Sequence, residues 1–377
     1  MARRSRELRA QGRDIIDLSL GEPDHDPPAF ALDAAHEALR GPWHKYTPVN
    51  GYLDVREAIA RKFERDNGLT YSPEQIVVST GAKHSIMNAV MALCGPGDEV
   101  VIPAPYWVSY SEQVKLAGAT PVIVPGTLEE DWKPPVERIA AAITPRTRLL
   151  MFSSPCNPSG SVLSRAELEA LAAVVARHPG LYVIADEIYE HIVFEGAHAS
   201  FAALPGMLER TITVNGLSKA FALTGWRIGY IGAPLWIAQA CTKIQGQFTS
   251  GANSIAQRVA KACMQADPAM LAPMRADFLR RRDLTLNAMK AISGWRCNVP
   301  QGAFYLLPDV SASFNGSTIK GAVDLSLHLL DAAGVSLVEG ASFGAPNTLR
   351  ISYATSDGKL TEAMTRVARA VGELVPA

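Results

Sequence analysis

The sequence lacks the features that would place a chain of 377 residues in a specialised class. Its five cysteines are odd in number and show no paired metal-ligand spacing, so no metal site is expected and a reducing compartment fits best. No apolar run approaches the roughly 20 residues needed to cross a bilayer. The basic start at residues 3–9 is not followed by a signal-peptide pattern. We therefore expect a cytoplasmic protein.

The chain also has no excess of either charge, because 36 Lys and Arg residues balance 37 Asp and Glu residues. Without a bulk positive field, neither nucleic acid nor an anionic membrane is an expected partner, and a small molecule is the default. A long helix pattern at residues 268–293, which could bridge two parts of the chain, carries the basic triplet Arg280–Arg282, and the triplet is expected to lie on its solvated face. None of the eight histidines has metal or triad spacing, and none is assigned to catalysis.

What the chain does contain is an alternation of short apolar runs with helical patterns. Runs that are apolar at nearly every position are typical of strands buried on both faces. The alternation predicts an α/β fold, a mostly parallel sheet covered by helices, with ligands at the carboxyl ends of the strands. The five predicted strands are Gln75–Ser79, Glu99–Pro103, Arg148–Phe152, Leu181–Ala185 and Thr211–Val214. From about Trp295 the pattern changes to that of a smaller α+β domain.

Lys219 is the most informative residue, since it lies in a small, largely apolar loop after the last of these strands. Desolvation lowers the proton affinity of such a lysine and makes it a candidate Schiff-base amine. Ser218 and Arg227 add a hydroxyl and a permanent cation, so aldehyde capture and phosphate binding would lie side by side. This combination suits pyridoxal phosphate, although a bare Ser-Lys pair is more often a surface loop.

Seven motifs resemble, in order, those of fold-type-I pyridoxal-phosphate aminotransferases, class I/II, and most of all the bacterial aspartate aminotransferase branch. They are Gly21–Asp24, Tyr46–Pro48, Pro105–Tyr110, Asn157–Gly160, Asp186–Tyr189, Ser218–Phe221 and Leu349–Tyr353. The resemblance implies a large cofactor-binding domain at residues 41–290. It implies a small domain at residues 291–377, which residues 1–40 join.

The cofactor-binding residues follow partly from position and partly from the resemblance. Asp186 ends a buried strand, where the protonated ring nitrogen of pyridoxal phosphate would neutralise it. A strand-glycine-helix junction at residues 80–83 is a possible phosphate cradle. The resemblance implies Gly81, Ala82, Lys83, Trp107, Asn157, Asp186, Tyr189, Ser218, Lys219 and Arg227 as cofactor residues. Tyr46 would reach in from a second subunit, so the resemblance implies a homodimer.

Substrate contacts are expected from Gly21, Lys83, Trp107, Asn157 and Arg350. Two-residue alternation places Arg350 beside small residues, which suits bidentate capture of an α-carboxylate, although a solvated arginine gives the same pattern. In the branch that the chain resembles, a lysine at the position of Lys83 recognises the distal carboxylate of aspartate or glutamate.

The expected activity is transfer of an amino group from aspartate or another dicarboxylate to 2-oxoglutarate, with Lys219 as the catalytic residue. An aromatic amino acid or prephenate is the second choice of substrate, and a β-lyase reaction the third. A nucleotide-binding dehydrogenase would also explain the alternation, but the glycine fingerprint after the first strand is missing. Cys156, Ser159 and His25 differ from the residues common at these positions in the family. Family members usually carry a segment before the first helix, whereas the helix predicted here begins almost at Met1.

Overall fold

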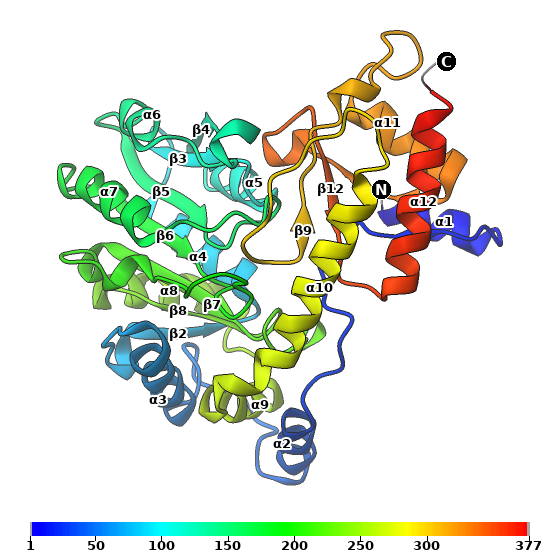
Figure 1. Ribbon diagram of the computed structural model, residues 1–377. Coiled ribbons are helices and arrows are strands. Elements are labelled where there is room, and N and C mark those ends of the chain that lie inside the picture. Colours follow the sequence, from blue (N-terminus) through cyan, green and yellow to red (C-terminus); the bar gives the residue numbers. More distant parts are fainter. Residues whose placement is uncertain (1, 375–377) are drawn as a thin grey trace.

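A sheet of seven strands forms the centre of the protein, in the order β2-β8-β7-β6-β5-β3-β4 (Figure 1). The computed structural model describes residues 2–374. Strand β8 runs antiparallel to β2 and β7, and the other neighbouring strands are parallel. The predicted mostly parallel sheet is confirmed. The strands are β2 (Ile76–Ser79), β3 (Glu99–Ala104), β4 (Thr120–Pro125), β5 (Thr147–Ser153), β6 (Tyr182–Asp186), β7 (Thr211–Gly216) and β8 (Gly229–Gly232).

Helices cover both faces of this sheet, which explains why its strands are apolar at nearly every position. In β5, Leu149 and Met151 join the core on the side of α4, α5 and α8. Leu150 and Phe152 point the other way, into the core formed with α6 and α7. The covering helices are α4 (Ala82–Leu93), α5 (Ser109–Leu116), α6 (Val136–Ala141), α7 (Arg165–Ala176) and α8 (Leu235–Phe248).

Three helices surround the β2 and β8 edge: α2 (Ala29–Arg40), α3 (Leu53–Lys62) and α9 (Ser254–Gln265). Helix α2 packs mainly against α9, and Ala31 and Ala35 belong to the same apolar cluster as Ile76 of β2. The contacts of residues 29–40 are therefore with the segment expected to form the large domain, although residues 1–40 were assigned to the small one.

The rest of the chain builds a second, smaller α+β part around β9 (Tyr305–Leu306), β11 (Val338–Glu339) and β12 (Leu349–Ser352). Near the N-terminus, β1 (Ile16–Asp17) pairs in parallel with β10 (Val335–Ser336), so the first residues join this part. Its helices are α1 (Ala2–Ala10), α11 (Ala322–His328) and α12 (Asp357–Gly372).

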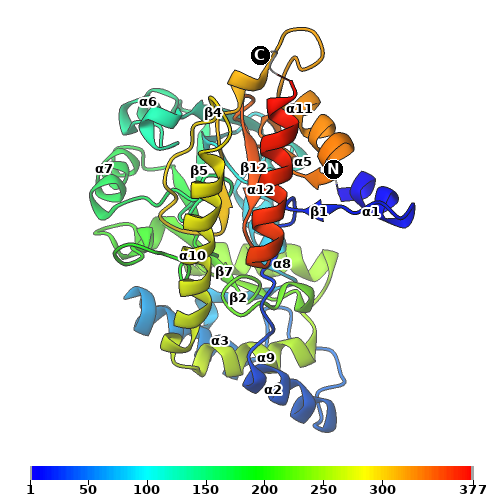
Figure 2. The same ribbon diagram turned by 45° about the vertical axis from the view of Figure 1, so that its right-hand side comes forward.

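Helix α10 (Ala272–Met289) is the long helix that the sequence predicts over residues 268–293. It runs between the two parts and packs along α12, as Figure 2 shows. Within residues 2–374, no helix combines the length and apolar character needed to cross a membrane.

Candidate active site

A cavity of about 440 Å³ opens where the carboxyl ends of β5, β6 and β7 face the smaller α+β part. This is the edge at which a parallel sheet is expected to bind ligands. Nearly all of the sequence-predicted site residues line it: Gly21, Ala82, Lys83, Trp107, Asn157, Asp186, Tyr189, Ser218, Lys219, Arg227 and Arg350. Gly81 lies next to the lining, whereas Tyr46 is 98% exposed and does not line it.

Lys219 follows β7, and its Nζ donates a hydrogen bond to the carbonyl of Gly21 at 2.5 Å. Burial lowers the pKa of Lys219 to about 8, and the nearby cations Arg350 and Arg227 act in the same direction, while Glu22 opposes them. This is the effect of desolvation that the sequence predicts. At neutral pH roughly a tenth of the amine is then in the neutral, nucleophilic form.

Asp186 ends β6 with its carboxylate buried beside the cavity. Its Oδ2 accepts a hydrogen bond from the Tyr110 hydroxyl at 2.7 Å, and its Oδ1 accepts one from the amide of Ile188 at 3.2 Å. Burial raises the pKa of Asp186 to about 6 in spite of these bonds. A buried carboxyl with this shift suits a cationic group, such as a protonated ring nitrogen, placed against it.

Tyr189 lines the cavity from the turn after β6, and its hydroxyl lies 2.9 Å from that of Tyr305 on β9. Sequence reasoning missed Tyr305 and also Tyr110 as site residues. The only signal for Tyr110 is its position three residues after Trp107 in the quoted motif. Tyr305 comes from the smaller part of the chain, and no local pattern links it to Tyr189.

The start of α4 has the geometry that the predicted phosphate cradle requires. Gly81 has φ of 85°, a left-handed conformation that glycine adopts without strain. A Cβ on Gly81 would lie 2.4 Å from Nη2 of Arg227, and one on Gly229 would lie 2.1 Å from the amide nitrogen of Ala82. These two glycines therefore let the helix start and the Arg227 guanidinium approach each other. Amide hydrogens, the helix dipole and a guanidinium are the donors that a phosphate group needs.

Arg350 lies on β12 and is only 7% exposed, so the alternative of a solvated arginine is wrong. Its Nη1 donates to Oδ1 of Asn157 at 3.0 Å and its Nη2 to the carbonyl of Ser19 at 2.6 Å. The guanidinium is stacked between the rings of Tyr305 and Phe343, at 4.7 and 4.9 Å. It is thus held in place by neutral groups and keeps its charge available for an anion.

Lys83 occupies the first turn of α4, and its Nζ lies 5.0 Å from the centre of the Trp107 ring. The bond from Nε2 of Gln113 to the Lys83 carbonyl, at 2.8 Å, fixes this turn. Both side chains line the cavity, and Trp107 is not a fully buried core residue. Among the described residues, Lys83, Lys219, Arg227 and Arg350 form no ion pair.

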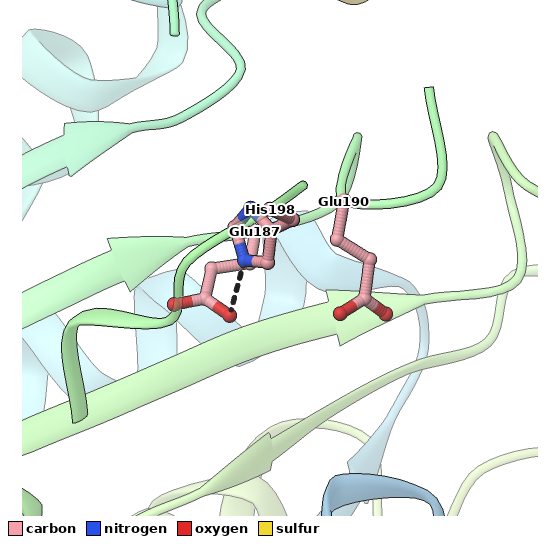
Figure 3. A group of neighbouring side chains, drawn as sticks. All are labelled: Glu187, Glu190 and His198. Atoms are coloured by element: carbon pink, nitrogen blue, oxygen red, sulfur yellow. Dashed lines mark hydrogen bonds and ion pairs between the residues drawn. The ribbon is translucent and has the colours of Figure 1, made fainter. Parts of the chain in front are cut away.

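On the other side of the turn after β6, Glu187, Glu190 and His198 form a buried cluster (Figure 3). Their geometry is compatible with a metal ion, but Glu190 is already paired with Lys62 and Glu187 with His198. These residues show no metal-ligand spacing in the sequence, and their side chains do not line the cavity described above.

The fold and the cavity define an enzyme built around a reactive lysine and a set of anion-binding groups. Residues 13–367 match the family described as Aminotransferase class I and II. The chain belongs to this family of pyridoxal-phosphate enzymes, as the resemblance implied.

Two relatives with curated names are similar over almost the whole chain. A bifunctional aspartate aminotransferase and glutamate/aspartate-prephenate aminotransferase of Petunia hybrida is 48% identical, over 97% of this chain and 78% of its own. An aspartate/prephenate aminotransferase of Cereibacter sphaeroides is 45% identical, over 97% and 93%. The crystal structure of the aspartate aminotransferase from Rhizobium meliloti superimposes with a TM-score of 0.95 at 41% identity, over 98% and 94%.

Proposed function

We propose that the protein transfers the amino group of aspartate or another dicarboxylic amino acid to 2-oxoglutarate, with pyridoxal phosphate as cofactor. The observation that carries this proposal is the imbalance of charge in the cavity. Four cationic side chains, Lys83, Lys219, Arg227 and Arg350, line it without an ion pair among residues 2–374, and Asp186 is the one carboxylate in its lining. Such a site suits ligands with several negative charges.

The residues present fit the cofactor. Gly81, Ala82, Lys83, Ser218 and Arg227 would hold its phosphate, and Asp186 would hold its ring nitrogen in the protonated form. Tyr189 and Asn157 would bind the ring oxygen, and Trp107 would cover the ring face. When bound, pyridoxal phosphate supplies an electron sink that stabilises negative charge on the substrate α-carbon.

The other steps belong to side chains of the chain itself. Arg350 and Asn157 would orient the α-carboxylate of the substrate, assisted by the Gly21 backbone. Lys83 would bind the distal carboxylate as a compact charge. The Nζ of Lys219 would take the proton from the α-carbon and return it, since a desolvated amine with a pKa near 8 works as a base close to neutral pH.

The test of this proposal is the visible spectrum of the purified protein. The loaded wild type should be yellow, and borohydride should fix the cofactor on Lys219, where peptide mapping would find it. A Lys219→Ala variant should lose both the reducible bond and transamination of aspartate. If that variant kept the wild-type rate, the assignment of Lys219 would be wrong.

A second substrate is favoured by the relatives named aspartate/prephenate aminotransferases. Prephenate also carries two carboxylates, so the same charged cavity is suited to it. Rates with aspartate or glutamate as donor, and with 2-oxoglutarate or prephenate as acceptor, would rank the two activities. An aromatic amino acid as donor belongs in the same panel. So does an amino acid with a leaving group on its β-carbon, from which β-elimination would indicate a lyase.

We further infer a homodimer in which Tyr46 of one subunit completes the phosphate site of the other. The near-complete exposure of Tyr46 in a single chain supports this inference. The division into large and small domains and the cytoplasmic location also stay predictions.

A further inference from the structure

The buried cluster behind the turn after β6 has contacts that connect three segments of the site. Asp186 at the end of β6, and Ile188 and Tyr189 in the turn that follows, line the cavity. Glu187 and Glu190 of the same turn are buried and do not line the cavity. With His198 they form a cluster of neighbouring side chains (Figure 3). The two sides of one short turn therefore serve different purposes.

Glu190 is the hub of this network, and its side chain is 4% exposed. Its Oε1 accepts hydrogen bonds from Nζ of Lys62 and, at 2.7 Å, from Nδ2 of Asn215. Its Oε2 accepts one from Nδ2 of Asn67 at 2.7 Å. Nε2 of His191 lies 3.2 Å from Oε1. Although burial opposes ionisation, the Lys62 ammonium holds the pKa of Glu190 well below its usual range.

Asn215 links this hub to the strand that leads to the reactive lysine. It lies near the end of β7, and its Nδ2 also donates to the carbonyl of Glu187 at 3.2 Å. Its Oδ1 accepts from the amide of Gly216 at 2.7 Å, three residues before Lys219. The network thus joins α3, the turn after β6 and the end of β7.

Glu187 closes the other end of the network. Its Oε1 accepts from Oγ of Ser200 at 2.8 Å, and its Oε2 lies 3.0 Å from Nε2 of His198. Every carboxylate oxygen of Glu187 and Glu190 therefore has a partner, and the Lys62 ammonium already supplies a cation. A metal ion would have to displace these groups, so the cluster is better explained as a fixed scaffold.

We propose that the buried Lys62–Glu190 pair is a positioning element of the transamination site. It fixes Asp186 at the end of β6, and Tyr189 in the turn that follows, relative to the strand end that leads to Lys219. A buried ion pair is weak support for stability alone, because apolar residues of similar volume often replace it without loss. Its value here is in geometry: groups that act together on one cofactor ring must keep their separation, and small displacements are costly in rate. The proposal rests on the assignment of these three residues to the cofactor.

The decisive variant is the double substitution Lys62→Met with Glu190→Gln, which removes both charges and leaves neither unpaired. The glutamine carbonyl can still accept from Nδ2 of Asn215. Its amide group can donate to Oδ1 of Asn67, which Lys62→Met releases, once the Asn67 amide turns over. Asp54→Asn is the matched control. Asp54 lies on α3, as Lys62 does, but it pairs with Arg258 and Lys261 of α9 and does not line the cavity. Cofactor affinity of the apoprotein, the pH midpoint of the visible absorption of the loaded protein, kcat and KM for aspartate, and Tm are measured for each.

We expect the double variant to bind the cofactor about tenfold more weakly, to shift the pH midpoint and to lower kcat about tenfold, with KM changed roughly twofold at most. The control should change Tm alone. A double variant whose only change is a lower Tm would overturn the positioning role. If the double variant does not fold, Glu190→Gln alone is judged by the same readouts. A wild type without the visible absorption would instead overturn the cofactor assignment, and this inference with it.

Discussion

Lys83 is the residue whose charge we expect to decide between a dicarboxylate and a neutral substrate. It has no ion-pair partner among the described residues, and its Nζ lies over Trp107 at the cavity wall. Lys83→Ala should lower kcat/KM for aspartate by about 1.5–3 kcal/mol, the scale of a charge-assisted hydrogen bond. Activity toward a neutral or aromatic amino acid should change much less.

The matched control for this prediction is Lys115→Ala, on the neighbouring α5, where the lysine pairs with Glu112 at the surface. It should leave both activities unchanged. Steady-state kinetics with the two donor classes would decide the matter. Equal losses on both donors would mean that Lys83 serves the cofactor or the fold, and dicarboxylate specificity would then be withdrawn.

The burial of Asp186 should lower the stability of the apoprotein, although the proposed function requires this carboxylate. Burial raises its folded pKa from 3.8 to about 6. The folded protein without cofactor therefore keeps a proton that the unfolded chain releases between pH about 4 and about 6, and stability falls across this window. Above it the penalty is complete, at about 3 kcal/mol.

The apoprotein of Asp186→Asn should accordingly resist urea better than the wild type at pH 7.5, by roughly 2–3 kcal/mol, and the difference should vanish below pH about 4. The same variant should lose most of its transamination rate, because the ring nitrogen loses its counter-ion. Urea titrations of both apoproteins at several pH values measure the first effect. Identical curves at pH 7.5 would show that burial does not penalise this carboxylate.

The sequence was informative about residues whose signal is local. Lys219 after its strand, Asp186 at a strand end and Gly81 before a helix could each be identified from neighbouring residues. Tyr305 could not, because its contact with Tyr189 joins positions 116 apart in the chain. The Lys62–Glu190 pair could not be predicted either, because its two residues are far apart in the chain. In addition, a lysine on a helix is expected in solvent.

At the scale of elements, the predicted strands and the long helix α10 were found, because burial on both faces leaves an unbroken apolar run. The solvated face predicted for Arg280–Arg282 was wrong for two of its three residues. Arg281 and Arg282 are 8% and 6% exposed. Helix α10 packs against α12, and so residues that an isolated helix would expose become buried.

Arg281 links separate elements through α10. Its Nη1 lies 2.6 Å from Oδ1 of Asp24, three residues after Gly21, and its Nε lies 3.6 Å from Oδ1 of Asp357 at the start of α12. Arg281→Met should reduce the free energy of unfolding by about 1.5–3 kcal/mol, because Asp24 loses its guanidinium partner, whereas Asp357 keeps its pair with Arg280.

Arg280→Met is the control for this prediction, since Arg280 is half exposed and pairs with Asp277 and Asp357 at the surface. It should cost at most about 1 kcal/mol. Thermal or urea unfolding of both variants provides the measurement. If the two variants were destabilised equally, the burial of Arg281 would carry no energetic weight.

At the scale of the whole molecule, the sequence indicated two parts but not where the first helices belong. Strand β1 pairs with β10 in the smaller part, yet α2 packs on α9 beside the seven-stranded sheet. Residues 18–28 connect the two, and they include Gly21, whose carbonyl receives the Lys219 hydrogen bond. The segment that crosses between the two parts thus also lines the cavity. A single domain boundary in the sequence cannot describe this, because the segment contributes to both parts.

The last prediction concerns a second copy of the chain. If Tyr46 serves the phosphate site of the partner subunit, Tyr46→Phe should weaken cofactor binding in the homodimer by about tenfold, the loss of one charge-assisted hydrogen bond. A Lys219→Ala homodimer should be inactive. Mixing the two variants under conditions of subunit exchange gives a hybrid in which one site has its own Lys219 and receives Tyr46 from the Lys219→Ala subunit.

That site should bind cofactor with wild-type affinity, so activity at limiting cofactor should rise above the mean of the parent variants. If Tyr46 instead acted within its own subunit, each site of the hybrid would carry one of the two defects, and mixing would restore nothing. Differently tagged subunits allow the hybrid to be isolated and its cofactor affinity measured directly. A hybrid no better than Tyr46→Phe alone would remove Tyr46 from the partner's site.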